Sequence, residues 1–335
     1  MRARPIFLTT ALLGVFLMFC QNSVKTVHQS NIGPQNFICY SWQETDTSLA
    51  LLNGSKVVWK LNYNTQRGKP YFSPLNTLDG RNLVWLRPDD HPWHYGLWFS
   101  WKYINKKNFW EEDRITKLSE GQATLDSMTK TLGKDFMAEF KMHISYSPNG
   151  RSKVLREKRT MKMYPPDNNG NYFIDWFMEW TAQKDTVVLD REIPKKLGGP
   201  EWGGYAGLSY RAAPEMSQHV YRHANDWETN EELVGYGEKA KWMDLSGNLP
   251  ESKETSGLTI FNYPENTADE VAWYIYKDGN FAFFNASPLF NRPITLSPGV
   301  TMKHNYRILV HGKALSREEI DVHYQNFIDA DDQEN

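Results

Sequence analysis

The feature that most constrains this chain is the alternation of apolar and polar residues in many short segments. Such alternation is typical of β-strands that bury one face. Turn residues separate the segments, as in "SPNG" (147–150) and "PPDNNGN" (165–171). The alternating segments are residues 55–63, 135–146, 153–164, 172–182, 257–263, 271–276, 281–287 and 301–312. Strands joined by short turns predict an antiparallel all-β protein.

One stretch, residues 316–330, has instead the spacing of an amphipathic helix. Ser316 and Glu319 have the spacing of a capping box, and apolar residues recur at helical intervals from Ile320 to Ile328. So many strands with a single helix exceed what a small barrel holds. The sequence therefore predicts a large antiparallel two-sheet sandwich with one C-terminal helix.

The two ends of the chain have different compositions. Residues 1–22 combine basic residues, an apolar run over 6–19 and a polar end, which is the layout of a secretory signal peptide. Cys20 stands where a lipoprotein cysteine would be, but residues 17–19 lack the small side chains expected before it, so lipidation and simple cleavage both stay open. We expect an exported protein, periplasmic or anchored at the cell surface as a lipoprotein. The remainder, residues 35–335, is expected to form a single β-sandwich catalytic domain with no transmembrane span.

Charge and composition narrow the class of ligand. The chain has 335 residues and a formal charge of -2, so it lacks the basic excess that binding to nucleic acid requires. It contains 13 Trp, 17 Tyr and 17 Phe residues. Aromatic rings fill β-sandwich cores, and they also stack against the apolar faces of sugars. A carbohydrate ligand is therefore compatible with the composition.

The segment "DDHPWHYGLWFSW" (89–101) places two histidines among large aromatic residues. In a regular strand His91 and His94 would point to opposite faces, but Pro92 breaks the hydrogen-bond ladder and favours a bend. The bend would direct both imidazoles toward one cavity. Three roles stay open for them: proton transfer, ligation of a divalent cation together with a distant third ligand, and a structural role.

The segment "GGPEWGGYAGLSYRAAPE" (198–215) is rich in glycine and carries Glu201, Tyr205, Tyr210 and Arg211. It lacks the context of a nucleotide-binding loop. Glycine lets the backbone approach a ligand closely, and arginine binds carboxylates through two parallel hydrogen bonds. The alternative is a bulged strand whose arginine makes a surface ion pair.

Two further segments flank the histidines. Residues 69–88 contain an Asp-Gly hairpin signal followed by Arg81, and Asp90 lies two residues after this segment. The segment "NFWEED" adds Trp110 and Glu111. Charged loops are usually solvated, but these four side chains are candidates for substrate binding.

Together, "KPYFSPLNTLDGRNLVWLRPDDHPWHYGLWFSW" (69–101), "YAGLSYR" (205–211) and "LSPGVTMKHNYRILVHG" (296–312) resemble a bacterial family labelled PmoA-like, found in polysaccharide-utilisation loci. The label comes from a methane oxygenase subunit, which needs several membrane spans that this chain lacks. The resemblance covers residues 50–312. It implies a galactose-mutarotase-like supersandwich and, as functional precedent, a dehydratase that acts on uronic acids of ulvan oligosaccharides.

Dehydration of a uronic acid would require three functions from the site. A cation must stabilise the carboxylate as negative charge spreads onto it, a base must remove the C5 proton, and an acid must protonate O4. We assign Arg211 to the carboxylate and His91 and His94 to the base and acid in either order, with Tyr205 or Tyr210 as substitute acid. This scheme requires no cofactor, although a divalent cation held by the two histidines would also fit the pattern.

Substrate binding would fall to residues around this centre. Trp98 or Trp110 is expected to stack on the sugar ring. A glycoside hydrolase would instead use paired carboxylates, which Glu201 with Asp90 or Glu111 could supply. The same residues would also be consistent with a sugar epimerase or with a non-catalytic glycan-binding protein.

Overall fold

The computed structural model describes residues 39–63, 69–148, 150, 152–225, 227–229, 236–266, 271–279 and 281–331. The predicted signal peptide and Cys20 lie outside these residues. The described residues from Tyr40 onward belong to one compact unit.

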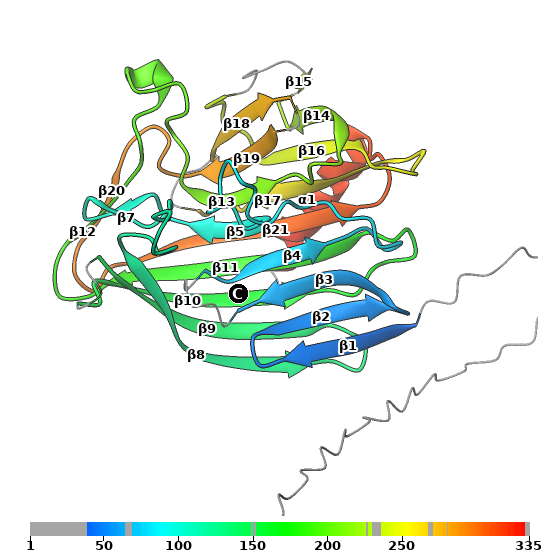
Figure 1. Cartoon of the computed structure of the whole chain (residues 1–335), viewed down its shortest axis with the longest axis horizontal. Helices are drawn as coiled ribbons and strands as arrows, with labels where there is room; N and C mark the ends of the chain where they lie inside the picture. The colour runs from blue at the N-terminus through cyan, green and yellow to red at the C-terminus, as the bar shows by residue number, and fades with distance from the viewer. Residues whose placement is uncertain are drawn as a thin grey trace, which may run out of the picture. The chain divides into compact units, whose positions relative to one another are not determined.

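One large antiparallel sheet, here called the front sheet, has the strand order β1-β2-β3-β4-β5-β13-β19-β18 (Figure 1). Its first five strands are consecutive in the chain, and the last three come from the C-terminal half. The strands are β1 (Tyr40–Thr45), β2 (Ser48–Asn53), β3 (Lys56–Asn62), β4 (Tyr71–Leu75), β5 (Leu97–Ser100), β13 (Gly207–Arg211), β18 (Ala272–Asp278) and β19 (Phe281–Ser287).

The second large sheet, the back sheet, has the order β15-β14-β16-β17-β21-β11-β10-β9-β8. In Figure 1 the blue strands of the front sheet overlap its green strands. Its strands are β8 (Gln122–Leu132), β9 (Ala138–Ser147), β10 (Leu155–Met163), β11 (Tyr172–Ala182), β14 (Ser217–His223), β15 (Trp227–Thr229), β16 (Trp242–Asn248), β17 (Thr255–Asn262) and β21 (Thr301–His311).

A third, small sheet was not expected from the sequence. It joins β6 (Tyr103–Ile104), β7 (Lys107–Asn108), β12 (Val187–Asp190) and β20 (Ile294–Leu296). These strands are too short to show a clear period-two pattern, which explains why alternation did not reveal them. A short 3-10 helix, η1 (Lys195–Leu197), follows β12.

The main core lies between the two large sheets. Along β11 the side chains of Trp176 and Trp180 are fully buried and point toward the front sheet. There Trp176 packs against Phe72 with ring centroids 5.9 Å apart, and Trp180 packs against Phe99 at 5.2 Å. The predicted antiparallel two-sheet sandwich is therefore confirmed.

The predicted C-terminal helix is also confirmed, as α1 (Arg317–Asp331). Its capping box forms as expected, because the Glu319 backbone N–H donates to Ser316 Oγ at 3.2 Å and the Ser316 N–H donates to Glu319 Oε2 at 2.7 Å. The helix lies beside β17 and β21 (Figure 1), with Tyr324 packed on Phe261 at 5.9 Å. It thus covers the outer face of the back sheet.

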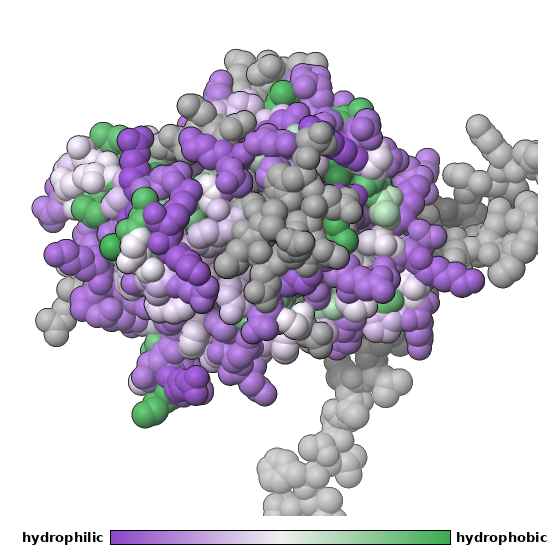
Figure 2. All heavy atoms as spheres, turned by 90° about the horizontal axis from the view of Figure 1, so that it is seen from above, coloured by the Kyte–Doolittle hydropathy of each residue, from purple (hydrophilic) through white to green (hydrophobic). Residues whose placement is uncertain are grey.

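Figure 2 shows hydrophobic residues on one face as small groups separated by hydrophilic ones. Among the described residues, no helical segment combines the length and the apolar character that a membrane crossing requires.

Candidate functional site

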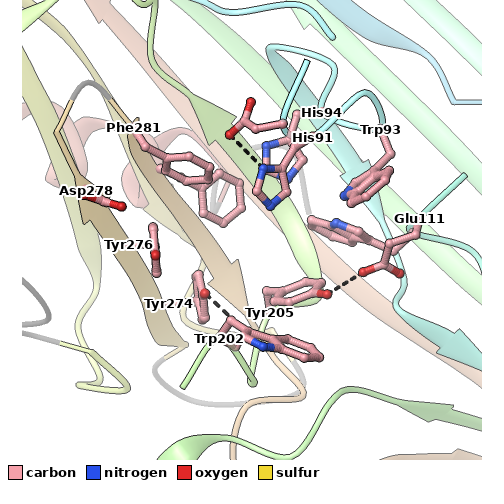
Figure 3. Close-up of a pocket in the computed structure, with 13 residues that line it drawn as sticks. His91, Trp93, His94, Glu111, Trp202, Tyr205, Tyr274, Tyr276, Asp278 and Phe281 are labelled. Carbon is pink, nitrogen blue, oxygen red and sulfur yellow. Dashed lines mark hydrogen bonds and ion pairs between the residues drawn. The ribbon is translucent and has the colours of Figure 1, made fainter. Parts of the chain in front are cut away.

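A pocket of about 500 Å³ opens on the outer face of the front sheet (Figure 3). On β18 and β19 the side chains of Tyr274 and Phe283 face this pocket, whereas their neighbours Ile275 and Phe284 face the main core. The volume lies in the range of small-molecule sites. The lining residues are Asp90, His91, Trp93, His94, Trp110, Glu111, Trp202, Tyr205, Tyr274, Tyr276, Asp278, Phe281 and Phe283.

The predicted bend at Pro92 brings the two histidines together. Pro92 and Trp93 occupy a turn that is closed by a hydrogen bond of 2.9 Å from the His94 N–H to the His91 carbonyl oxygen. The imidazoles of His91 and His94 stack with centroids 4.7 Å apart and line the same pocket. The turn therefore brings together two side chains that a regular strand would direct to opposite faces.

Asp90 links His91 to a buried arginine. Its Oδ2 accepts a hydrogen bond from His91 Nδ1 at 2.8 Å and another from Arg211 Nη2 at 3.3 Å. Burial alone would raise the pKa of Asp90, but the bond from His91 and the charge of Arg211 lower it below its ordinary value. Asp90 is thus an ionised acceptor that orients His91, whose side chain is 38% exposed.

His94 differs from His91 in its surroundings. Its side chain is buried, and its ring stacks on Phe283 at 5.2 Å and tilts against Trp98 at 5.1 Å. Burial lowers the pKa of His94 well below its ordinary value, and the nearby charges of His91 and Arg211 lower it further. His94 is therefore neutral at pH 7, and its buried Nδ1 has no hydrogen-bond partner among the described residues.

A second polar cluster lies across the pocket from His91, centred on Tyr205 (Figure 3). The Tyr205 hydroxyl donates to Glu111 Oε1 at 2.5 Å and accepts from Lys102 Nζ at 3.0 Å. Lys102 also contacts Glu111 at 2.5 Å. Burial and the negative charge of Glu111 raise the pKa of Tyr205 well above its ordinary value, so the hydroxyl keeps its proton at neutral pH.

Glu111 in this cluster is ionised. Burial alone would raise the pKa of its carboxyl, but the charge and hydrogen bond of Lys102 lower it below the ordinary value. A hydrogen bond of 2.6 Å from Asn108 Nδ2 acts in the same direction.

The two tryptophans expected to stack on a sugar have different positions. Trp110 lines the pocket, packed against Tyr205 with centroids 4.8 Å apart. Trp98 lies beneath the pocket and is fully buried by His94 and Trp110. Trp98 therefore supports the floor and offers no face to a ligand.

Three other predicted site residues lie outside the pocket. Tyr210 points into the core between the sheets, where its hydroxyl donates to the Leu83 carbonyl oxygen at 2.8 Å. Arg81 pairs with Asp79 at 2.9 Å. Glu201 is exposed and pairs with Lys195, and unlike Asp90 and Glu111 it does not line the pocket as a hydrolase pair would require.

Arg211 lies directly behind the pocket wall. Its guanidinium carbon is 3.1 Å from the centroid of the Phe281 ring and 4.8 Å from that of Trp85. The residue is only 1% exposed, and its Nε and Nη1 atoms have no hydrogen-bond partner among the described residues. Burial lowers the pKa of Arg211 to about 10, against the opposing effect of Asp90.

Sequence reasoning missed Lys102, which contacts Glu111 and Tyr205, and much of the pocket wall. Lys102 follows the histidine segment directly, and Trp202 lies inside the glycine-rich segment, so a signal for both was present in the sequence. The β18–β19 hairpin contributes Tyr274, Tyr276, Asp278, Phe281 and Phe283. These hairpin residues carried no signal of function, since their alternation is that of any half-buried strand.

No group of three His, Cys, Asp or Glu side chains suited to a metal ion occurs in the part of the chain that the structure describes. Around His91 and His94 the nearest carboxylate contact is Asp90, whose Oδ2 is already bonded to His91 and Arg211. The arrangement suits proton transfer better than metal ligation.

Comparison with solved structures finds distant similarity to two GH36 α-galactosidases of Geobacillus stearothermophilus. AgaB has 8% sequence identity and a TM-score of 0.43, with 82% of this chain and 41% of that chain covered. AgaA has 10% identity and a TM-score of 0.40, with coverage of 82% and 40%. This chain spans about two fifths of the length of either enzyme. Similarity this low does not indicate a shared function.

Comparison with curated proteins finds no match. A family model, described as a family of unknown function (DUF6807), matches residues 48–325. This range includes every residue that lines the pocket. The chain therefore belongs to the DUF6807 family.

Proposed function

We propose that this protein is a carbohydrate-active enzyme that dehydrates the non-reducing-end uronic acid of an oligosaccharide to a 4,5-unsaturated uronate. The observation that carries the proposal is the pairing of two proton-transfer groups across one aromatic-walled pocket. His91, oriented by Asp90, faces the cavity from one side, and Tyr205, bonded to Glu111 and Lys102, faces it from the other (Figure 3).

In this reaction His91 removes the C5 proton of the uronic acid through its Nε2 atom. The electrons of the C5–H bond form the C4=C5 double bond as the C4–O4 bond breaks. Tyr205 gives its hydroxyl proton to O4, which leaves as water, and Lys102 stabilises the resulting tyrosinate. The imidazolium of His91 then returns a proton to Tyr205 through solvent, which restores both groups.

Arg211 supports the choice of an acidic substrate. Two of its three guanidinium nitrogens are buried without a partner among the described residues, and the guanidinium lies against the ring of Phe281, which lines the cavity. Unpaired buried donors are costly, and a carboxylate that displaced the Phe281 ring would satisfy them. The substrate carboxylate would then lie next to the base that removes the α-proton.

A glycoside hydrolase is the second candidate, because carboxylates of Asp90, Glu111 and Asp278 line the pocket. Such an enzyme needs one carboxylic acid that stays protonated through a raised pKa. The pKa values of Asp90 and Glu111 are instead lowered, by His91 and Arg211 in one case and by Lys102 in the other. This difference favours His91 and Tyr205 as the proton-transfer groups.

Mass spectrometry and ultraviolet absorbance of products distinguish these functions. Oligosaccharides with a saturated uronic acid at the non-reducing end should lose one water and gain the absorbance of a conjugated uronate. Chain cleavage with gain of water would replace the proposal with hydrolysis. Binding without any change in mass would show that the pocket only recognises glycans.

A further inference from the structure

Trp202 is the most exposed aromatic side chain of the pocket. It is 49% exposed, whereas Trp110, Tyr274 and Phe283 in the same wall are buried. In the view of Figure 3, Tyr205 lies between His91 and Trp202. The indole thus belongs to a part of the cavity beyond the two proton-transfer groups, and it offers an apolar face to a ligand there.

The segment that carries Trp202 is held by the pocket wall. The Tyr274 hydroxyl donates to the Trp202 carbonyl oxygen at 3.2 Å, and the Tyr236 hydroxyl donates to the carbonyl oxygen of Gly203. Tyr236 and Tyr274 also pack against each other with centroids 5.5 Å apart. An exposed tryptophan on a backbone fixed by two buried or half-buried tyrosines is preorganised for binding.

The glycines beside Trp202 are required by close backbone packing. A Cβ atom at Gly203, or at Gly199 in the same segment, would collide with the Ile193 carbonyl oxygen. At Gly204, where φ is +112°, a Cβ would also press on the Phe290 ring. The glycine-rich sequence therefore folds the segment tightly enough to bring one large aromatic ring to the cavity.

We infer that Trp202 forms a second saccharide-binding position, which takes the sugar ring adjacent to the one that lies between His91 and Tyr205. A flat indole in a pocket that is also lined by polar groups such as Glu111 suits a pyranose, whose C–H face stacks while its hydroxyls form hydrogen bonds. The inference rests on the proposed function, and it makes the substrate an oligosaccharide of two or more rings.

Binding measurements on a saccharide series test this position. The probes are a saturated uronic acid alone and the di- and trisaccharides that carry it at the non-reducing end. They are titrated calorimetrically into His91→Gln protein so that turnover does not interfere. We expect the disaccharide to bind roughly tenfold more tightly than the monosaccharide, since an aromatic platform contributes on that order. Adding Trp202→Ala should abolish the gain and leave monosaccharide affinity unchanged.

Leu197→Ala provides the matched control. Leu197, like Trp202, lies between β12 and β13, and it is 51% exposed but does not line the pocket. This change should therefore keep the full gain in affinity from the second ring. Trp202→Phe should keep part of it. Equal weakening of mono- and disaccharide by Trp202→Ala, or no effect on either, overturns the inference.

The outcome for Trp202 is separable from that for the reaction. If products show no loss of water while the second ring still binds through Trp202, the proposed dehydration fails and the binding position stands. If water is lost equally well from mono- and disaccharide, and Trp202→Ala changes neither rate, the reaction stands and the binding position is wrong.

Discussion

The imidazole of His91 stacks on that of His94 at a centroid distance of 4.7 Å and an interplanar angle of 29°. Their environments are nonetheless unequal. His91 is partly exposed and bonded to Asp90, whereas His94 is buried on Phe283. Burial, together with the nearby charges of His91 and Arg211, lowers the pKa of His94 well below its ordinary value.

This inequality predicts that His91 is the base. His91→Gln should lower kcat by roughly 10²- to 10⁴-fold, the usual contribution of a proton-transfer group, with a smaller effect on KM. Asp90→Asn should lower kcat as well, because it removes the charge that orients the imidazole. The control is His143→Gln, an exposed histidine on β9 of the back sheet. Wild-type turnover by His91→Gln would remove His91 from the mechanism.

Tyr205→Phe tests the acid. Removal of the hydroxyl should reduce kcat by roughly 10²- to 10⁴-fold, since O4 would then leave without a proton. Because the pKa of Tyr205 lies well above 10, the wild-type rate should not decline through loss of this proton between pH 7 and pH 10. Tyr164→Phe, which removes a hydroxyl bonded to Asp175 outside the pocket, should leave kcat unchanged. Equal kinetics for the two variants would contradict the assignment.

Arg211→Ala should lower both stability and activity. The change leaves space beneath Phe281 and deprives Asp90 of its buried counter-charge, which together should cost about 2 to 4 kcal/mol in the free energy of unfolding. Arg211→Lys should lower the free energy of unfolding less than Arg211→Ala does. It should not reproduce the contact with Phe281, because an ammonium cannot stack on that ring as a planar guanidinium does. Urea denaturation and steady-state kinetics check these effects. An unchanged unfolding midpoint for Arg211→Ala would show that the buried contact is not stabilising.

His304 makes stability depend on pH. It lies in the main core beside Trp101, with both ring nitrogens unpartnered among the described residues, and burial lowers its pKa to about 3. Between pH 6.5 and pH 3 the unfolded chain therefore binds a proton that the folded chain excludes. The free energy of unfolding should fall as the pH falls, by up to about 1.4 kcal/mol per pH unit from this residue.

His304→Phe keeps a ring at this position and removes the titration. Its free energy of unfolding, measured in urea at pH 7, 6 and 5, should depend less on pH than that of the wild type. A residual slope is expected from His219 and His223, because burial lowers the pKa of each to about 4, and from His94, because burial lowers its pKa well below the ordinary value. A slope identical to that of the wild type would show that His304 is not the titrating group.

Removal of divalent cations should leave activity unchanged, because in the proposed reaction side chains alone move the protons. Dialysis against a chelator followed by assay of water loss checks this expectation. If the chelator abolishes turnover and added cation restores it, His91 and His94 act as ligands.

The sequence was informative wherever local chemistry decided the structure. Alternation predicted β11 and β21, Ser316 with Glu319 predicted the start of α1, and Pro92 predicted the bend that joins the histidines. Each of these features depends on residues close together in the chain.

The rest of the site depends on which strands become neighbours. Phe283 faces the pocket because β19 pairs with β13, a contact between segments far apart in the sequence. Tyr210 and Arg211 were both proposed for the site, yet adjacent residues of a strand point to opposite faces, so only Arg211 could lie on the pocket side. Trp98 has the correct face, but the burial that removes it from the surface comes from His94 and Trp110.

The same strands that form the core also form the pocket, at alternate positions. On β5, Leu97 belongs to the core and Trp98 to the pocket floor, and on β19, Ala282 and Phe283 are divided in the same way. Mutations at neighbouring codons should therefore have different effects: one removes a contact between the two sheets, and the next alters the floor or wall of the pocket. A change in the shape of the pocket therefore requires substitutions in only one of these two sets of codons, while the other set keeps the sandwich intact.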